Sequence, residues 1–428
     1  MLQVLASITC NCVNRVDKPY VWPLLLKFVF AVYLLTMLTI PIAGKAAAGV
    51  LLLLGLGGLY RLKKQHYVLI KSEKWLLFSF ALFSVVSIVS FFYWPQTRDA
   101  RMHLEDYVTF MMLLPLYLLL RQFRFDFMFL IVLFSAAAFE LGALSLLSNN
   151  ARPSGDVNPM RYGNISLVLA VIPLAAMLLV RNKVLSFKLL LIVASVLGLT
   201  ACFLTQSRGA LLSIPVLAFL YSVYLYRTGH PKFLIFFVAG AVLIVAAASQ
   251  QDRVQRSFSS VDRYAQGDSR SALGARFDMF KAAGVLIKQN PVFGHGLNSY
   301  SPLATEIRRS TPGMSYEVGL WANPHNEVLQ VMVEKGVIGL ITLLLLFAAP
   351  GYLFLQALGK ADDSGAGQQI KFYALSGLSL LVVYAVAGQS VALFEHDVFN
   401  HFFALMVLLF ASQIRVIGYM EGGAESEA

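Results

Sequence analysis

Long apolar runs that carry charge only at their flanks constrain this chain more than any other feature of its sequence. Phe187–Thr205 and Phe233–Ala248 are two examples. About 20 helical residues, rising about 1.5 Å each, cross the hydrocarbon core of a membrane, which is about 30 Å thick. Only 13% of the residues are charged, against about 25% in soluble proteins, and strand-like alternation is absent. The sequence therefore predicts an all-α polytopic integral membrane protein.

We predict about twelve membrane spans within a single membrane domain, residues 1–428. The long segment 250–325, between the ninth and tenth spans, is the sizeable aqueous element. Within it, residues 275–288 mix apolar and basic side chains in the pattern of a short amphipathic helix at a membrane surface. The predicted spans are 22–42, 46–60, 75–94, 104–120, 125–147, 164–180, 187–205, 209–226, 233–249, 326–355, 371–394 and 399–414.

Lysines and arginines are distributed unevenly among the predicted loops. When the N-terminus is placed in the cytoplasm, most basic residues of the short loops fall on the cytoplasmic side, as the positive-inside rule requires. Both termini are then cytoplasmic, and segment 250–325 lies on the opposite side. The same bias accounts for much of the net charge of +11, so we predict no nucleic-acid partner.

The segment Trp321–Gln330 contains the most informative polar residues. Asn323 is a favourable N-cap and Pro324 suits the first helical position, so we expect His325 in the first turn of the tenth span. The positive end of a helix dipole disfavours imidazolium there, and a neutral histidine is what a general base requires. The alternative is a solvated polar residue near a helix start.

The tenth predicted span is longer than the membrane core requires, so its first turns should protrude to the aqueous boundary. We therefore expect Glu334 and Lys335 to lie near water. Either side chain would be costly in lipid.

Three arginines fall on the same predicted side as His325. Arg208 occupies a short turn between two spans, Arg161 ends a loop, and Arg276 opens the amphipathic segment. A planar guanidinium matches the oxygens of a phosphate, so these residues predict an anion-binding site. Contact with lipid headgroups is the alternative. This alternative is weakest for Arg208, because the short turn between the two spans keeps its side chain beside the bundle.

Two residues of the glycine-containing segment 291–300 are further candidates. His295 and Tyr300 are candidate glycan contacts. The alternative is a structural turn, since its glycines permit a tight turn or close approach of the backbone.

Acidic residues in and between the spans are ambiguous. Glu140, inside the fifth span, is either functional or part of a hydrogen bond between helices. The last outside loop has side chains of the types that bind metals, but their spacing fits no metal motif. We therefore predict no metal site there and expect a hydrated loop or a sugar contact. These side chains are Glu395, His396, Asp397 and His401.

Five short motifs, in this order and spacing, resemble the O-antigen ligase and polymerase superfamily of bacterial envelope enzymes. The family often has tryptophan after the second-motif arginine, where this chain has phenylalanine. The long outside loop before the histidine and the number of spans also resemble this family. The matching motifs are Ser207–Ala210, Arg276 with Phe280, Pro291–Gly296, Pro324–Glu327 and Gly336–Gly339.

The resemblance implies a glycosyltransferase of lipopolysaccharide biosynthesis in the bacterial inner membrane, with its active site on the periplasmic face. It implies an undecaprenyl-diphosphate-linked glycan donor, a lipid A–core oligosaccharide acceptor, surrounding membrane lipids and no cofactor. Arg208 and Arg276, with Arg161 as a third, would stabilise the diphosphate leaving group. His325 would orient or deprotonate the acceptor hydroxyl. The supports expected for the histidine or the acceptor are Asn326 and Glu327.

Several other functions compete with the ligase interpretation. An O-antigen polymerase and a protein-targeted oligosaccharyltransferase share the same core within the superfamily. A transporter or flippase for lipid-linked glycans is the main alternative of another class, although transporters usually carry ionisable residues near the midplane and repeated halves. A structural membrane protein would not require His325 and the arginines on one face.

Overall fold

The computed structural model describes residues 21–62, 69–93, 98–150, 152–155, 157–179, 184–250, 260, 263–264, 266 and 271–425. All regular secondary structure in these ranges is helical, which confirms the predicted class. The helices are α2 (Val21–Thr36), α3 (Pro41–Leu62), α4 (Lys71–Phe91), α5 (Arg98–Met112), α6 (Leu114–Leu120), α7 (Phe127–Leu147), α8 (Pro159–Leu179), α9 (Leu185–Leu204), α10 (Arg208–Arg227), α11 (Pro231–Ser249), α13 (Ala272–Gln289), α14 (Tyr300–Ser310), α15 (Glu327–Lys360), α16 (Gly365–Ala387) and α17 (Asp397–Glu425).

Eight helices of the described chain are long and apolar enough to cross a membrane: α4, α7, α8, α9, α10, α15, α16 and α17. Shorter apolar stretches occur in α2, α3 and α11. The predicted count of twelve spans is therefore not confirmed. The predicted span 104–120 is divided into α5 and α6, because Pro115 at the start of α6 has no amide hydrogen to continue the helical ladder.

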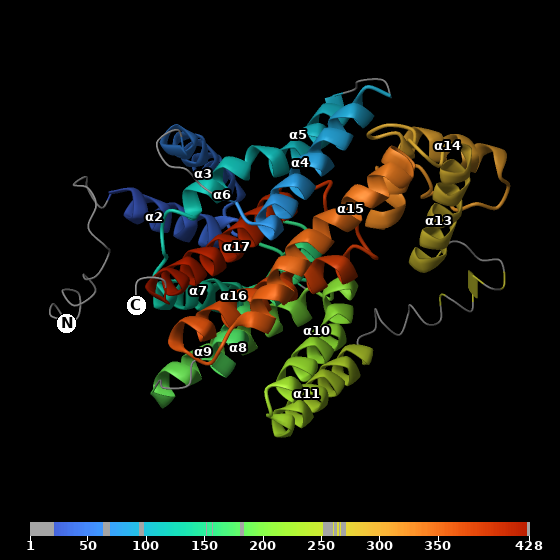
Figure 1. Cartoon of the computed structure of the whole chain (residues 1–428). Helices are drawn as coiled ribbons and strands as arrows, with labels where there is room; N and C mark the ends of the chain where they lie inside the picture. Colours follow the sequence, from blue (N-terminus) through green and yellow to red (C-terminus); the bar gives the residue numbers. More distant parts are fainter. Residues whose placement is uncertain are drawn as a thin grey trace.

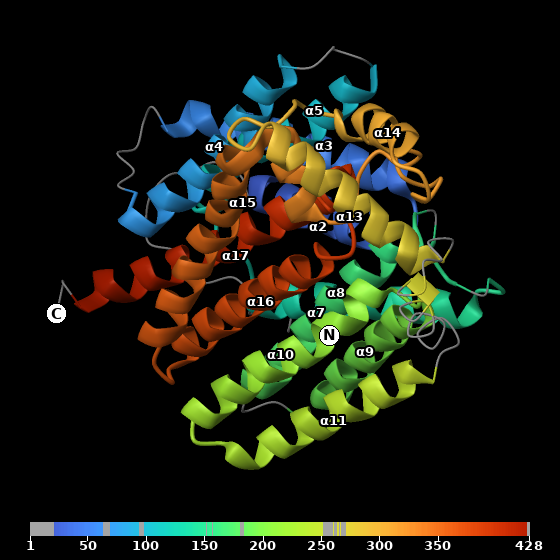
Figure 2. The same ribbon diagram turned by 90° about the vertical axis from the view of Figure 1, so that its right-hand side faces the viewer.

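The centre of the bundle is formed by α8, α16 and α17, whose side chains are buried on most faces. A helix that is apolar all round belongs in such a position. Helices α10 and α11 lie side by side at the edge of the bundle (Figure 1, Figure 2). Helices α13 and α14 lie together at one end, beside the first turns of α15 (Figure 1).

Segment 250–325 contributes a small second core. The predicted amphipathic helix is present as α13, but its buried residues pack against the rest of this segment and against α15. Whether its other face contacts a membrane remains a prediction, as does the periplasmic location of the segment. The second core is formed by Met279, Ala282, Ala283, Leu286, Tyr300, Ala304, Val318 and Val333.

Helix α15 is broken at Gly336, where φ is +60° and ψ is −156°. The break removes helical partners from carbonyls before it and from amides after it. The turn that follows α13 replaces them. The amide of His295 donates to the carbonyl of Val333 at 2.7 Å, and the amide of Val337 donates to the carbonyl of Pro291 at 2.8 Å. The glycine-containing turn 291–296 is therefore built into α15.

We expect Gly336→Ala to destabilise the protein by more than about 2 kcal/mol, because it adds a positive-φ penalty to a steric clash. A Cβ at position 336 would lie 2.3 Å from the carbonyl carbon of Val292. Thermal unfolding in detergent measures the effect. Gly359→Ala is the matched control, since position 359 of the same helix has open space around a Cβ. Equal melting temperatures for the two variants would contradict the expected packing.

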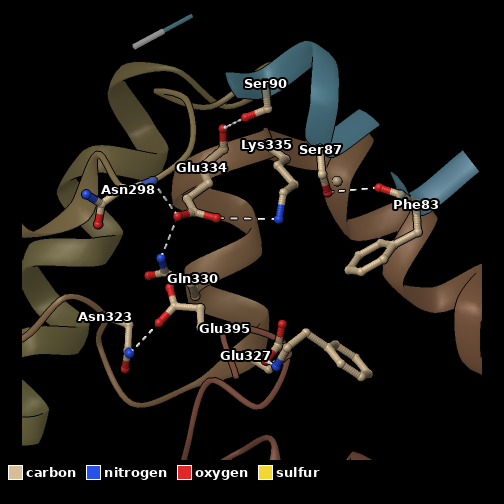
Figure 3. A network of polar contacts seen from close by, with 12 residues as sticks. Phe83, Ser87, Ser90, Asn298, Asn323, Glu327, Gln330, Glu334, Lys335 and Glu395 are labelled. Atoms are coloured by element: carbon tan, nitrogen blue, oxygen red, sulfur yellow. Dashed lines mark hydrogen bonds and ion pairs between the residues drawn. The ribbon is translucent and has the colours of Figure 1, made fainter. Parts of the chain in front are cut away.

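Glu334 and Lys335 are almost completely buried, which corrects the prediction that they lie near water. Helices α4 and α5 and the turn after α13 cover this part of α15. The carboxylate of Glu334 accepts from the amide of Asn298 at 2.7 Å and from Gln330 at 2.8 Å (Figure 3). Lys335 Nζ lies 3.4 Å from Glu334 Oε2 and 3.5 Å from the centre of the Tyr107 ring. Both charges therefore have partners inside the protein.

Glu140 is half-buried, and Thr39 donates a hydrogen bond of 3.3 Å to its Oε1 atom. Thr39 lies in the turn between α2 and α3, whereas Glu140 belongs to α7. This contact matches the structural alternative foreseen for this acidic residue.

Candidate functional site

His325 lies in the turn that precedes α15. The helix begins at Glu327, and Asn326 is its N-cap, with a side-chain oxygen that accepts an amide of the first turn at 3.0 Å. The prediction that Asn323 caps the helix is therefore wrong. Asn326 has the extended backbone typical of an N-cap, whereas His325 has a φ of +55°. A non-glycine residue in this region is held there by its surroundings.

Asn323 shapes this turn. Its side-chain oxygen accepts from the amide of His325 at 2.9 Å. Its side-chain amide donates to Glu395 Oε2 at 2.5 Å (Figure 3). Asn323 and Glu395 are both buried. An asparagine that bonds the backbone two residues ahead stabilises a turn in place of a helix.

The environment of His325 favours its neutral form. Burial, assisted by the positive charge of Arg276, lowers the pKa of His325 from 6.5 to about 4. Its ring centre lies 5.8 Å from that of Trp321, whose side chain is exposed. The expected neutral histidine thus arises mainly from burial. The prediction placed His325 in the first turn of the helix, whereas it lies before the helix begins.

The connection between α16 and α17, residues 388–396, holds the start of α15. The amide of Glu327 donates to the carbonyl of Gly388 at 2.7 Å. The carboxylate of Glu327 accepts from the amide of Phe394 at 3.0 Å. The side chain of Asn326 donates to another backbone carbonyl of the connection at 3.3 Å. Asn326 and Glu327 therefore attach the start of α15 to this connection, and their expected support of the histidine or the acceptor stays a prediction.

Arg208 begins α10, and its neighbour packs closely against the same connection. A Cβ on Gly209 would lie 2.5 Å from the hydroxyl of Ser390 and 3.1 Å from the Cα of Ala387. A larger residue at position 209 would force α10 and this connection apart. The half-buried Arg208 is thereby held beside the connection that supports His325.

Arg161 reaches the connection from the first turn of α8. Its Nη2 atom lies 3.0 Å from Nδ1 of His396. Two residues on, a Cβ at Gly163 would lie 2.4 Å from the hydroxyl of Thr205, in the turn that leads to Arg208. The two arginines therefore lie on adjoining segments. Arg276, on α13, carries a positive charge that contributes to the lowered pKa of His325.

His295 and Tyr300 belong to the packing of the loop. Tyr300 has no exposed surface, and its hydroxyl donates to the carbonyl of Met279 at 3.3 Å. His295 Nε2 lies 2.8 Å from the carbonyl of Leu286. A fully buried tyrosine cannot contact a glycan, which corrects the prediction for Tyr300. The partner of His295 favours the structural alternative for this histidine as well.

The residues near the last helix are arranged differently from the expected hydrated loop. Glu395 is buried, and Asp397 forms an ion pair with Lys45 at 2.6 Å. No group of three or more metal-binding side chains is found in the described ranges. Sequence reasoning missed Glu395 as a partner of Asn323. The sequence signal that could have indicated this turn was Asn323, because an asparagine can bond the backbone amide two residues ahead.

Two features define the class of this protein. The apolar helices indicate a multi-pass membrane protein, and its candidate site combines a half-buried histidine with arginines on adjoining segments. Residues 193–344 match the family model described as O-antigen ligase. This range contains Arg208, Arg276 and His325, and the match supports membership of the O-antigen ligase superfamily.

The chain is also similar to a protein of Haemophilus influenzae (strain ATCC 51907 / DSM 11121 / KW20 / Rd) that is described as uncharacterized. The two are 24% identical over 392 residues, which cover 89% of this chain and 96% of the relative. The likeness therefore extends well beyond the matched family region, to nearly the whole membrane bundle.

Proposed function

We propose that this protein is an O-antigen ligase, which transfers a glycan from undecaprenyl diphosphate to lipid A–core oligosaccharide during lipopolysaccharide biosynthesis. In this proposal it works at the periplasmic face of the bacterial inner membrane, with both termini in the cytoplasm. The observation that carries the proposal is the convergence of segments. The segments of His325, Arg161 and Arg208 are held against the connection 388–396, and two of them lie in the family match.

The proposed reaction uses these residues in distinct roles. The acceptor hydroxyl oxygen attacks the anomeric carbon of the donor glycan, and the bond from that carbon to the diphosphate oxygen breaks. His325 takes the hydroxyl proton, and undecaprenyl diphosphate leaves with the bonding electrons. Arg208 and Arg276, with Arg161, stabilise the negative charge on the leaving diphosphate. The arginines supply the positive charge, so the proposal needs no metal or nucleotide.

The low pKa of His325 has a testable effect on the pH profile. The free enzyme should hold this base neutral down to about pH 4, because burial and Arg276 lower the pKa from 6.5 to about 4. The profile of kcat/KM reports ionisations of the free enzyme, so its acid limb should lie well below 6.5. Transfer is measured after short exposures to each pH, with activity rechecked at pH 7 to exclude unfolding.

Arg276→Gln provides the control for this profile. Removing a positive charge beside His325 should move the acid limb upward, because imidazolium is then less disfavoured. An acid limb near pH 6.5 in the wild type would contradict the buried environment of His325. An unchanged limb in Arg276→Gln would show that the charge of Arg276 does not act on the base.

The proposed function is tested by transfer with the purified protein in detergent, with EDTA present. The donor is an undecaprenyl-diphosphate-linked O-antigen, and the acceptor is lipid A–core. Glycan joined to lipid A–core supports a ligase that requires no divalent metal. Lengthening of donor chains alone would assign a polymerase, and transfer to an added protein acceptor would assign an oligosaccharyltransferase. Movement of donor across vesicles without any transfer would assign a flippase.

A further inference from the structure

Three consecutive residues of the connection 388–396 contact three different parts of the protein. The amide of Phe394 donates to Glu327 at 3.0 Å. Glu395 accepts from Asn323, and His396 contacts Arg161. The connection therefore links the histidine turn, the start of α15 and the start of α8.

The side chain of Phe394 fixes the connection in the core. Its ring centre lies 5.4 Å from that of Phe110 and 5.4 Å from that of Phe403. The carbonyl of Phe394 also accepts from the side chain of Asn400 at 2.9 Å. A residue that is packed and bonded in this way gives its neighbour Glu395 a defined position.

Two hydrogen bonds run from Glu395 to His325. Glu395 accepts from the side-chain amide of Asn323 at 2.5 Å (Figure 3). The side-chain oxygen of Asn323 accepts from the amide of His325 at 2.9 Å. Glu395 is 4% exposed and Asn323 is 8% exposed, so water does not compete strongly for either bond. The second bond holds His325 at its φ of +55°, a value that is uncommon for residues other than glycine.

We propose that Glu395 is a positioning residue, which holds His325 in its working conformation through Asn323. The consequence for catalysis rests on the proposed role of His325, whereas the effect on the conformation of the turn does not. A base must lie within hydrogen-bond reach of the proton that it accepts. Displacing such a group by about 1 Å can lower a rate about 100-fold.

The surroundings of Glu395 suit an uncharged acceptor. Burial, followed by the nearby charges of Glu334 and Glu327, raises the pKa of Glu395 well above its usual range. Glutamine has nearly the same shape and also offers a side-chain oxygen to Asn323. Glu395→Gln should therefore keep the bond to Asn323, whereas Glu395→Ala removes it.

Kinetics of glycan transfer test the positioning role. We expect Glu395→Ala and Asn323→Ala each to lower kcat by about 100-fold with little change in KM, and Glu395→Gln to stay within about threefold of the wild type. The double alanine variant should match the single variants, because both changes break one chain of contacts. Equal losses in Glu395→Gln and Glu395→Ala would overturn the proposal in favour of proton transfer by Glu395. Additive losses would overturn it too.

A readout that needs no turnover separates this inference from the proposed function. Diethyl pyrocarbonate modifies neutral histidine, so mass spectrometry of the modified peptide follows the protonation of His325 with pH. We expect a midpoint near 4 in the wild type and midpoints closer to 6.5 in Asn323→Ala and Glu395→Ala, where His325 is released to water. Unchanged midpoints would overturn the proposal. A shifted midpoint in a protein that transfers no glycan would uphold it while removing the proposed function.

Glu73→Ala is the matched control for loss of a buried carboxylate. Glu73 is fully buried in the first turn of α4. It accepts from Tyr117 at 2.7 Å and pairs with Arg121 at 3.1 Å. Its loss should lower the melting temperature and leave the midpoint of His325 unchanged. A shifted midpoint in Glu73→Ala would mean that general destabilisation explains the effect, which would overturn the positioning role.

Discussion

His325→Ala is expected to lower kcat for glycan transfer by about 10²- to 10⁴-fold, the range typical of a lost general base. The acceptor hydroxyl would then attack without a group to take its proton, while the arginines would still bind the donor. KM for the donor should therefore change little. Initial rates with saturating lipid A–core measure the effect.

The control for this loss is His230→Ala. His230 is an exposed residue in the turn between α10 and α11, at the opposite end of α10 from Arg208. Its replacement should leave the rate unchanged. Full transfer by a folded His325→Ala variant would remove this histidine from the mechanism and leave the ligase assignment intact.

Arg208→Lys should lower kcat by about 100-fold, although the charge is preserved. A lysine places one ammonium group where arginine offers a planar fork that matches two oxygens of a diphosphate. Arg208→Ala should cost about 10²- to 10³-fold, as does the loss of a single group that stabilises developing negative charge. Single-turnover rates with the lipid-linked donor separate this chemical effect from product release.

Arg227→Lys is the matched variant for Arg208, since Arg227 ends the helix that Arg208 begins. We expect no change in rate for it. A similar loss in both variants would indicate a general requirement for arginine on α10. Full activity in Arg208→Lys would show that positive charge alone suffices at this position.

The eight long apolar helices of the described chain were predictable because each follows from a local property, its uninterrupted apolar residues. His325 and the arginines were identifiable as candidates for the same reason, since polar residues stand out beside apolar spans. Their separations in space remained a prediction, because each lies on a different segment.

Features that depend on contacts between residues far apart in the chain could not be predicted from the sequence. The conformation of Gly336 depends on the turn 291–296, which is far from it in the chain. Glu334 and Lys335 were expected near water because their charges are visible in the sequence, whereas the helices that cover them are not. Asn323 suited an N-cap, but its bond to Glu395 gives it a different role. In each case a tertiary contact overrode a sound local preference.

The first seven residues of α15 are held at both ends. Glu327 is bonded to Gly388 where the helix begins, and Val333 is bonded to His295 just before the break. A helix turns by about 100° for each residue, so inserting or deleting one residue between these points would rotate one attachment away from its partner. The number of residues between His325 and Gly336 is therefore fixed by geometry. A substitution within this stretch changes only side-chain packing. An insertion or deletion would change the position of His325 relative to the rest of α15.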